Sequence, residues 1–116
     1  MKSGSRIWPL SIVIVTLLGA LPGIISGQVT ASMNGRIEDP SGAGVLGAIV
    51  SVTSQETGAT RTVITDEAGA YQILSLPVGR YDVKAEKPGF KAAVDTGINL
   101  VVGQQAVVNL ELEVGG

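Results

Sequence analysis

The chain has 116 residues, which suits a single domain, and only 16% of them are charged, with a net charge of −2 at pH 7. This composition argues against a nucleic-acid-binding protein, because such proteins need a basic surface to neutralise phosphates. The chain has no cysteine and no histidine. Disulfides and thiolate metal sites are therefore excluded, and the commonest metal ligand and general base is missing.

The first 27 residues have the pattern of a secretory signal peptide. Lys2 and Arg6 give a basic start, and an uncharged apolar stretch follows. Small residues surround the expected cleavage site in SGQVTAS. We expect a signal helix in residues 1–27, with cleavage after Gly27 or alternatively after Ala31. A retained membrane anchor is the other interpretation, because about 20 apolar residues are just enough to span a bilayer.

Cleavage would leave residues 28–116 as one domain. It removes Lys2 and Arg6 but no acidic residue, so the net charge changes from −2 to −4. A domain of this size buries roughly 60–65% of its unfolded surface. That is enough for one thin core, and a deep catalytic cavity is not expected.

Alternating apolar and polar residues predict strands throughout the expected mature chain. In chain order the predicted strands cover residues 31–39, 47–54, 60–65, 70–76, 80–87, 90–96 and 105–114. Residues 94–103 are ambiguous between a loop and a short strand. The residues expected to face inward on the later strands are Tyr81, Val83, Ala85, Val108, Leu110, Leu112 and Val114.

Turn signals separate these strands at intervals of about 8–12 residues, a spacing typical of an antiparallel sandwich. Each signal contains glycine, most of them with aspartate, serine or proline, as in DPSGAG, DEAGA, LPVG and KPG. The rings of Tyr71, Tyr81 and Phe90 fall on positions predicted to face inward. The regular spacing therefore indicates an all-β sandwich of about seven strands.

The same residues resemble the carboxypeptidase regulatory-like domain over roughly residues 32–114. The matching patterns are Asp-x-x-Gly, Gly-Ala-x-Val, Thr-Asp-x-x-Gly-x-aromatic, Leu-Pro-x-Gly-x-Tyr-x-Val and a final Gly-aromatic. They assign a structural role to Asp39, Gly42, Gly47, Ala48, Val50, Thr65, Asp66, Gly69, Tyr71, Leu76, Pro77, Gly79, Tyr81, Val83, Gly89 and Phe90. The family often has proline where this chain has Gly44. The resemblance implies an antiparallel, seven-stranded Greek-key sandwich of the prealbumin (transthyretin) type.

The resemblance implies a non-catalytic accessory or interaction module, because such domains accompany many different partners. In similar bacterial proteins, a signal peptide and this domain precede the plug and barrel of a TonB-dependent outer-membrane receptor. We therefore expect an exported protein that is periplasmic, outer-membrane-associated or extracellular, with a protein partner in the envelope. No cofactor, metal or nucleic acid is expected, and the membrane is contacted only through an uncleaved leader. The chain is either a small secreted protein or the front of a receptor gene.

Candidate catalytic and metal sites are weak. A nucleophilic triad lacks its histidine base, and Ser51, Ser54 and Ser75 fit strand and turn positions. A calcium site at Asp39, Asp66 and Glu67 lacks the alternating oxygen ligands of an EF-hand, so a turn-capping role for Asp66 is favoured.

Asn109 resembles the acceptor of the isopeptide bond in collagen-adhesin B-type domains. The first strand would have to supply a lysine partner, but it offers only Arg36, whose guanidinium stays protonated and cannot attack. An isopeptide bond is therefore not expected.

Carbohydrate binding is the main alternative function, because related folds serve as sugar-binding modules. Such sites usually present aromatic faces, and the aromatic residues of the mature chain are all predicted to lie in the core. A further alternative is strand addition at a free sheet edge, with NLELEVGG as the candidate edge. Glu111 and Glu113 would discourage uncontrolled pairing there.

Overall fold

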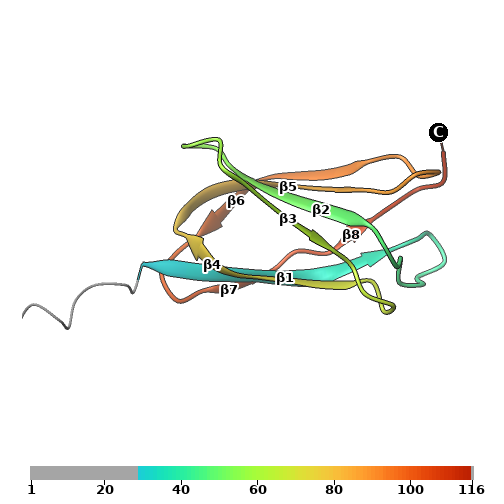
Figure 1. The fold of residues 1–116 in the computed structure, drawn as a ribbon, viewed down its shortest axis with the longest axis horizontal. Helices are drawn as coiled ribbons and strands as arrows, with labels where there is room; N and C mark the ends of the chain where they lie inside the picture. Colours follow the sequence, from blue (N-terminus) through green and yellow to red (C-terminus); the bar gives the residue numbers. More distant parts are fainter. Residues whose placement is uncertain (1–28, 116) are drawn as a thin grey trace, which may run out of the picture.

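The computed structural model describes residues 29–115, which form two sheets packed face to face (Figure 1). The strands are β1 (Thr30–Glu38), β2 (Ile49–Ser54), β3 (Thr60–Ile64), β4 (Ala70–Pro77), β5 (Gly79–Glu86), β6 (Ala93–Leu100), β7 (Gln105–Val107) and β8 (Leu110–Glu111). The all-β sandwich predicted from the alternation is confirmed. The predicted signal helix lies outside the described residues, and within them no helix is long and apolar enough to cross a membrane.

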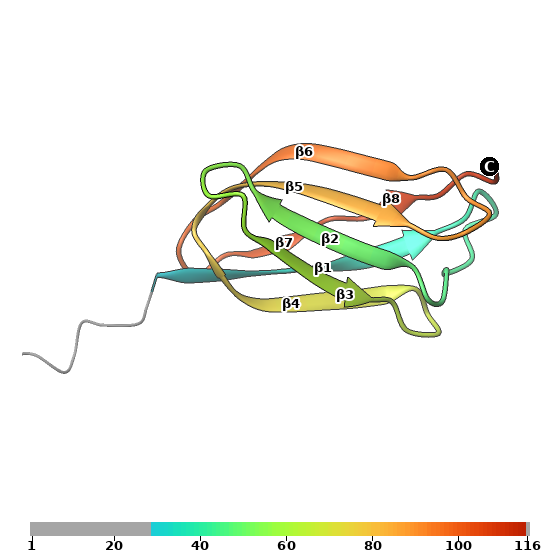
Figure 2. The same cartoon turned by 45° about the horizontal axis from the view of Figure 1, so that its top comes forward.

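One sheet has the order β4-β1-β7, with β8 also pairing to β1, and the other has the order β3-β2-β5-β6 (Figure 2). The chain changes sheet after β1, β3, β4 and β6. As a result β3 and β4, which follow each other in sequence, are edge strands of different sheets. The Greek-key description of these connections stays a prediction.

The structure corrects the prediction of one continuous strand over residues 105–114. That segment is split into β7 and β8, which makes eight strands rather than seven, and both run parallel to β1 rather than antiparallel. Between them, the N–H of Val108 donates to the carbonyl of Asn34 at 2.8 Å. The N–H of Arg36 donates to the side-chain Oδ1 of Asn109 at 2.8 Å, so a side chain replaces the main-chain acceptor and the strand is interrupted.

The structure also decides between strand and loop for residues 94–103. β6 covers Ala93–Leu100, so much of residues 94–103 is strand, and the predicted strand over residues 90–96 begins too early. Phe90 lies outside β6 and makes an isolated bridge with Val114. The prediction failed because the alternation of apolar residues continues through the turn that precedes β6.

The core lies between the sheets and follows the predicted alternation on β1, β2 and β5. Its largest completely buried side chains are Met33, Ile37, Ile73, Leu76, Leu100, Leu112, Val50, Val52 and Val83. Val114 was expected to face inward but is 72% exposed, and Leu110 is only half-buried. Beyond β8 the chain leaves the first sheet, so alternation no longer predicts which side faces the core.

Candidate functional site

Two aspartate turns of the same geometry lie at one end of the sandwich. In the first, Oδ1 of Asp39 accepts hydrogen bonds from the N–H groups of Ser41 at 2.9 Å and Ala43 at 3.1 Å. In the second, Oδ1 of Asp66 accepts from the N–H groups two and four residues later, each at 2.9 Å. The hydrogen bond from the Ser41 hydroxyl also lowers the pKa of Asp39. Asp39 and Asp66 therefore both cap turns. Their carboxylates, which a calcium site would need as ligands, already accept hydrogen bonds from main-chain amides.

The two turns pack backbone against backbone through glycines. Gly69 has a φ of +78°, and a Cβ atom on it would lie 2.8 Å from the Cα atom of Gly44. A Cβ atom on Gly44 would collide in turn with the carbonyl of Ala68. Gly44 stands where the family often has proline, and its missing side chain allows the two turns to touch. Nε of Arg36 also donates a hydrogen bond to the Ala68 carbonyl at 2.9 Å.

At the same end of the sandwich, Thr65 connects the end of β3 to the segment that precedes β2. Its side chain is buried, and its hydroxyl donates to the carbonyl of Val45 at 2.6 Å while accepting from the N–H of Ala48 at 2.8 Å. Both bonds satisfy main-chain groups beside the core, where an unpaired polar group would be costly.

Both tyrosine rings are buried and their hydroxyls are bonded to the main chain. Tyr71 donates to the carbonyl of Val108 at 2.6 Å, and Tyr81 donates to the carbonyl of Pro77 at 2.7 Å. Burial raises the pKa of Tyr71 to about 12, with a smaller contribution from the negative charge of Asp95. Burial also raises the pKa of Tyr81. Neither ring presents a free face of the kind that sugar stacking needs.

Phe90 departs from the expected inward position. It is half-buried against the margin of the core, where it lines a surface pocket of 370 Å³ with Ile49 and Lys87. The reason is its place in the turn before β6, so that its ring lies at the end of the sandwich rather than between the sheets.

Most of the remaining motif residues are either buried in the core or are glycines with positive φ. Leu76, Val83, Ala48 and Val50 are buried in the core. The motif glycines with positive φ, which favours glycine over other residues, are Gly42, Gly47, Gly69, Gly79 and Gly89. The structure thus brings Asp39, Thr65, Asp66 and Gly69 together at one end, while Pro77, Gly79 and Tyr81 lie at the other.

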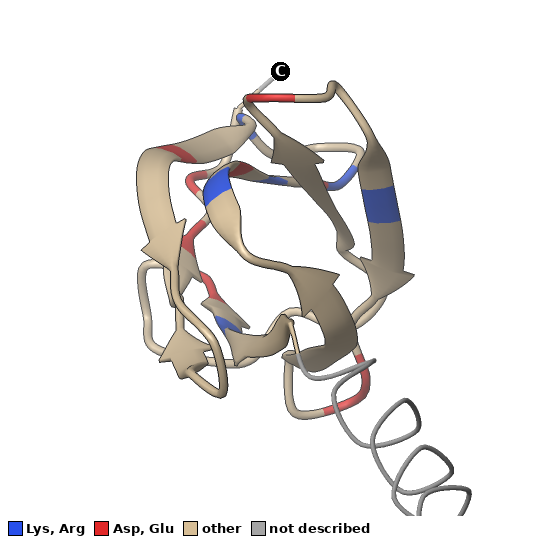
Figure 3. Cartoon of the chain, turned by 90° about the vertical axis from the view of Figure 1, so that its left-hand side faces the viewer, with Lys and Arg blue, Asp and Glu red and all other residues tan. Residues whose placement is uncertain are grey.

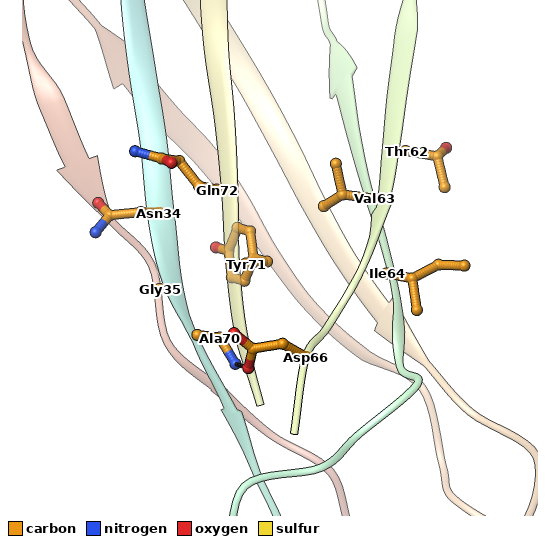
Figure 4. A pocket seen from close by; sticks show the side chains of 9 residues that line it. All are labelled: Asn34, Gly35, Thr62, Val63, Ile64, Asp66, Ala70, Tyr71 and Gln72. Atoms are coloured by element: carbon orange, nitrogen blue, oxygen red, sulfur yellow. Dashed lines mark hydrogen bonds between the residues drawn. The ribbon is translucent and has the colours of Figure 1, made fainter. Parts of the chain in front are cut away.

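An open groove of 860 Å³ separates the edge strands β3 and β4 (Figure 4). Residues 62–64 of β3 form one wall and residues 70–72 of β4 the other, with Asn34 and Gly35 of β1 beyond β4. Asp66 closes the end where the two strands are joined. The sequence did not predict this groove, because its two walls are edge strands of different sheets, and local alternation does not encode which strands become edges.

A second cavity, of 620 Å³, lies between the β2–β3 connection and the end of β4. Its charged residues are already engaged: Glu56 accepts from the N–H of Arg80 at 3.1 Å, and Arg61 donates to the carbonyl of Leu74 at 3.0 Å. Figure 3 shows acidic and basic residues scattered over the strands and loops. Within residues 29–115 there is no group of three or more acidic residues placed to hold a metal ion.

A family model for the carboxypeptidase regulatory-like domain matches residues 32–113. This chain belongs to that family. The carboxypeptidase regulatory-like domain is also 31% identical over 100 residues to the TonB-dependent transporter Oar of Myxococcus xanthus. The match covers 85% of this chain but 9% of the transporter, so the chain spans a small part of that relative's length.

Solved structures confirm the sandwich fold of this carboxypeptidase regulatory-like domain. The Bacillus anthracis TIE protein matches with a TM-score of 0.63 and 23% identity, over 74% of this chain and 17% of its own. A candidate carbohydrate-binding protein of Bacteroides uniformis has a TM-score of 0.58 and 22% identity, over 72% and 41%. Catechol 1,2-dioxygenase of Acinetobacter radioresistens has a TM-score of 0.62 and 16% identity, over 82% and 55%. At these identities the likeness shows the fold alone.

Proposed function

We propose that this domain is a non-catalytic accessory and interaction module of the cell envelope, of the kind that precedes the plug and barrel in TonB-dependent receptors. The observation that carries the proposal is the 31% identity to the TonB-dependent transporter Oar across 85% of this chain. The signal-peptide pattern before the domain supports the same order of segments. The domain would then lie in the periplasm or at the outer membrane after its leader is removed.

The hydrogen bonding of the polar side chains supports docking rather than turnover. The hydroxyls of Tyr71, Tyr81 and Thr65 donate to main-chain carbonyls, and Asp39 and Asp66 accept from main-chain amides. General acid–base catalysis needs a titratable group within reach of a substrate. Here these groups are bonded to the protein itself, and the chain contains no histidine.

Capture from the envelope tests the proposal. The immobilised domain, residues 28–116, would be incubated with solubilised envelope proteins of the source organism, and bound proteins would be identified by mass spectrometry. We expect the immobilised domain to retain a component of the TonB-dependent receptor machinery. Adding an excess of free domain should release that component. Capture of no envelope protein, or only of proteins that free domain does not displace, would count against an interaction module.

Carbohydrate binding is the second candidate, because the sandwich is similar to that of the Bacteroides uniformis protein. The burial of Tyr71 and Tyr81 argues against it, since these residues are only 6% and 4% exposed and their rings cannot stack on a sugar. A glycan array and calorimetric titration of residues 28–116 decide between the two. Robust glycan binding that is lost in Gln72→Ala, a substitution in the open groove, would reverse the order of the candidates.

A further inference from the structure

One side of β3 carries main-chain hydrogen-bonding groups that β2 does not use. At one end of the β2–β3 pair, the N–H of Ser54 donates to Ala59 at 2.8 Å, and at the other the N–H of Thr65 donates to Ala48 at 3.0 Å. Bonded and non-bonded pairs alternate in an antiparallel pair, and the register between these ends is unbroken. The residues whose N–H and C=O groups point away from β2 are therefore Thr60, Thr62 and Ile64.

The other edges of the sandwich are obstructed. On β4, the guanidinium of Arg61 donates to the carbonyls of Leu74 at 3.0 Å and Ser75 at 3.5 Å. β6 is interrupted by a register shift against β5 and by Gly97, which has a φ of +74°. The opposite edge of the first sheet consists of β7 and β8, which are only three and two residues long, so the candidate edge NLELEVGG offers a short ladder. β3 has neither a proline nor a bulge, and its one charged residue, Arg61, is turned towards β4, so it lacks the usual protections of an edge strand.

The open groove lies directly beside this edge. Thr62, Val63 and Ile64 form one of its walls, with Tyr71 and Gln72 on the opposite wall (Figure 4). Five residues of β3 span about 17 Å, which is the length of a typical short strand. Ile64 is 68% exposed, so an aliphatic side chain is available beside the free main-chain groups.

We infer that the open edge of β3 binds an extended segment of another protein, which adds to the second sheet as a fifth strand and places alternate side chains in the groove. This deepens the proposed function and rests on it, because it names the surface through which the module docks. Strand addition supplies affinity through main-chain hydrogen bonds and specificity through alternate side chains. The antiparallel orientation continues the pattern of the sheet, in which all the pairs are antiparallel.

Charge and side-chain chemistry describe the segment that fits. In an antiparallel arrangement its N-terminal end lies near Asp66, and Glu67 is in the same exposed turn. A basic residue at that end is therefore complementary. Inward positions meet Val63, which is half-buried, so small aliphatic residues fit there. The partner is an extended peptide with a basic residue at its N-terminal end and small aliphatic residues at alternate positions after it.

A pair of N-methylated peptides tests the inference on the unaltered domain. The probe is N-acetylated Lys-Val-Thr-Val-Thr-Val-Thr, titrated into residues 28–116 and followed by amide chemical shifts in NMR spectra. One analogue is methylated on the main-chain nitrogens of the valines and the other on those of the threonines. Since alternate N–H groups of an added strand point to the same neighbour, we expect one analogue to lose binding and the other to keep it. Equal effects of the two analogues would overturn the inference.

Substitutions at Thr62 supply a matched pair of variants. Thr62→Pro removes an N–H group that points away from β2, and proline is tolerated on the open side of an edge strand. We expect it to weaken peptide binding about fivefold, because the hydrogen bond that this N–H group donates to the peptide is lost. Thr62→Val keeps the N–H group and should bind as the unaltered domain does. Unchanged binding by a folded Thr62→Pro variant would overturn the inference, and if that variant does not fold, the methylated peptides decide.

The test also separates other occupants and the proposed function itself. A dimer seen in sedimentation equilibrium and abolished by Thr62→Pro would assign the β3 edge to a second copy of this chain and refute the peptide partner. If the peptide fails to bind while the envelope capture succeeds, the β3 site is refuted and the interaction module stands. If the peptide binds as described and the capture fails, the edge is a peptide site outside a receptor context.

Discussion

The carbonyl oxygen of Val108 occupies the space that a Cβ atom on Gly35 would need. The hydroxyl of Tyr71 donates to that same oxygen, and the N–H of Val108 donates to Asn34 of β1. Gly35 therefore allows the segment between β7 and β8 to lie directly against β1. This contact joins residues far apart in the sequence and brings the end of the chain into the first sheet.

Replacing Gly35 with alanine should destabilise the domain, because the new methyl group displaces the main chain at Val108 and disturbs its bond to Tyr71. Overpacking of this kind typically costs about 1–3 kcal/mol of unfolding free energy. Chemical denaturation monitored by circular dichroism would measure the loss. Asn34→Ala, on the neighbouring exposed position of β1, should change stability by less than about 0.5 kcal/mol. Equal midpoints for the two variants would show that the β7–β8 segment yields without strain.

Tyr81 and Phe90 should differ in their contribution to stability. Tyr81 is 4% exposed, so truncation to alanine should cost about 3–5 kcal/mol through lost transfer energy and a cavity. Phe90 is half-buried, so Phe90→Ala should cost about 1–2 kcal/mol, since part of its ring stays in water. Thermal unfolding of both variants measures the difference.

Lys84→Ala and Glu86→Ala are the controls on β5. Their side chains face outward and form an exposed ion pair at 3.6 Å, so each change should cost less than about 0.5 kcal/mol. A larger loss for Phe90→Ala than for Tyr81→Ala would contradict the burial of the two rings.

Stability should fall as the pH rises from 10 to 12. Tyr71 has its pKa raised from 10.0 to about 12, so in this range the folded state keeps a proton that the unfolded state loses. The stability contributed by the neutral hydroxyl is complete below pH 10 and is lost as the pH rises through about 12. The slope for one proton is at most about 1.4 kcal/mol per pH unit.

The Tyr71→Phe variant serves as the control for this pH dependence. It lacks the bond to Val108 and should be less stable near neutral pH, because a buried carbonyl loses its donor. Its unfolding free energy should decline less steeply between pH 10 and 12 than that of the unaltered domain. Parallel curves would show that the Tyr71 hydroxyl does not control the alkaline transition.

Export should remove the leader. The basic start and the uncharged stretch before SGQVTAS predict a mature N-terminus at Gln28, or at Ser32 if cleavage follows Ala31. Intact-mass measurement of the exported protein distinguishes the two sites. Recovery of the chain from the membrane fraction with Met1 still attached would support the retained anchor instead.

Local pattern in the sequence was enough to predict the sandwich and most of its core. Successive side chains of a strand point to opposite faces, so alternation identifies the buried faces of β1, β2 and β5 without knowledge of the pairing. The turns were equally predictable, because the carboxylates of Asp39 and Asp66 bond to amides only two and four residues away. Each of these features depends on residues close together in the chain.

Only the tertiary structure decided how the strands at the margins are used. The split at Val108 and Asn109 arises from bonds to Asn34 and Arg36, more than seventy residues earlier. The exposure of Val114 and Phe90 depends on where the chain leaves a sheet, which alternation does not encode. The open edge of β3 follows from β3 and β4 belonging to different sheets, and the pairing of strands distant in sequence determines that separation.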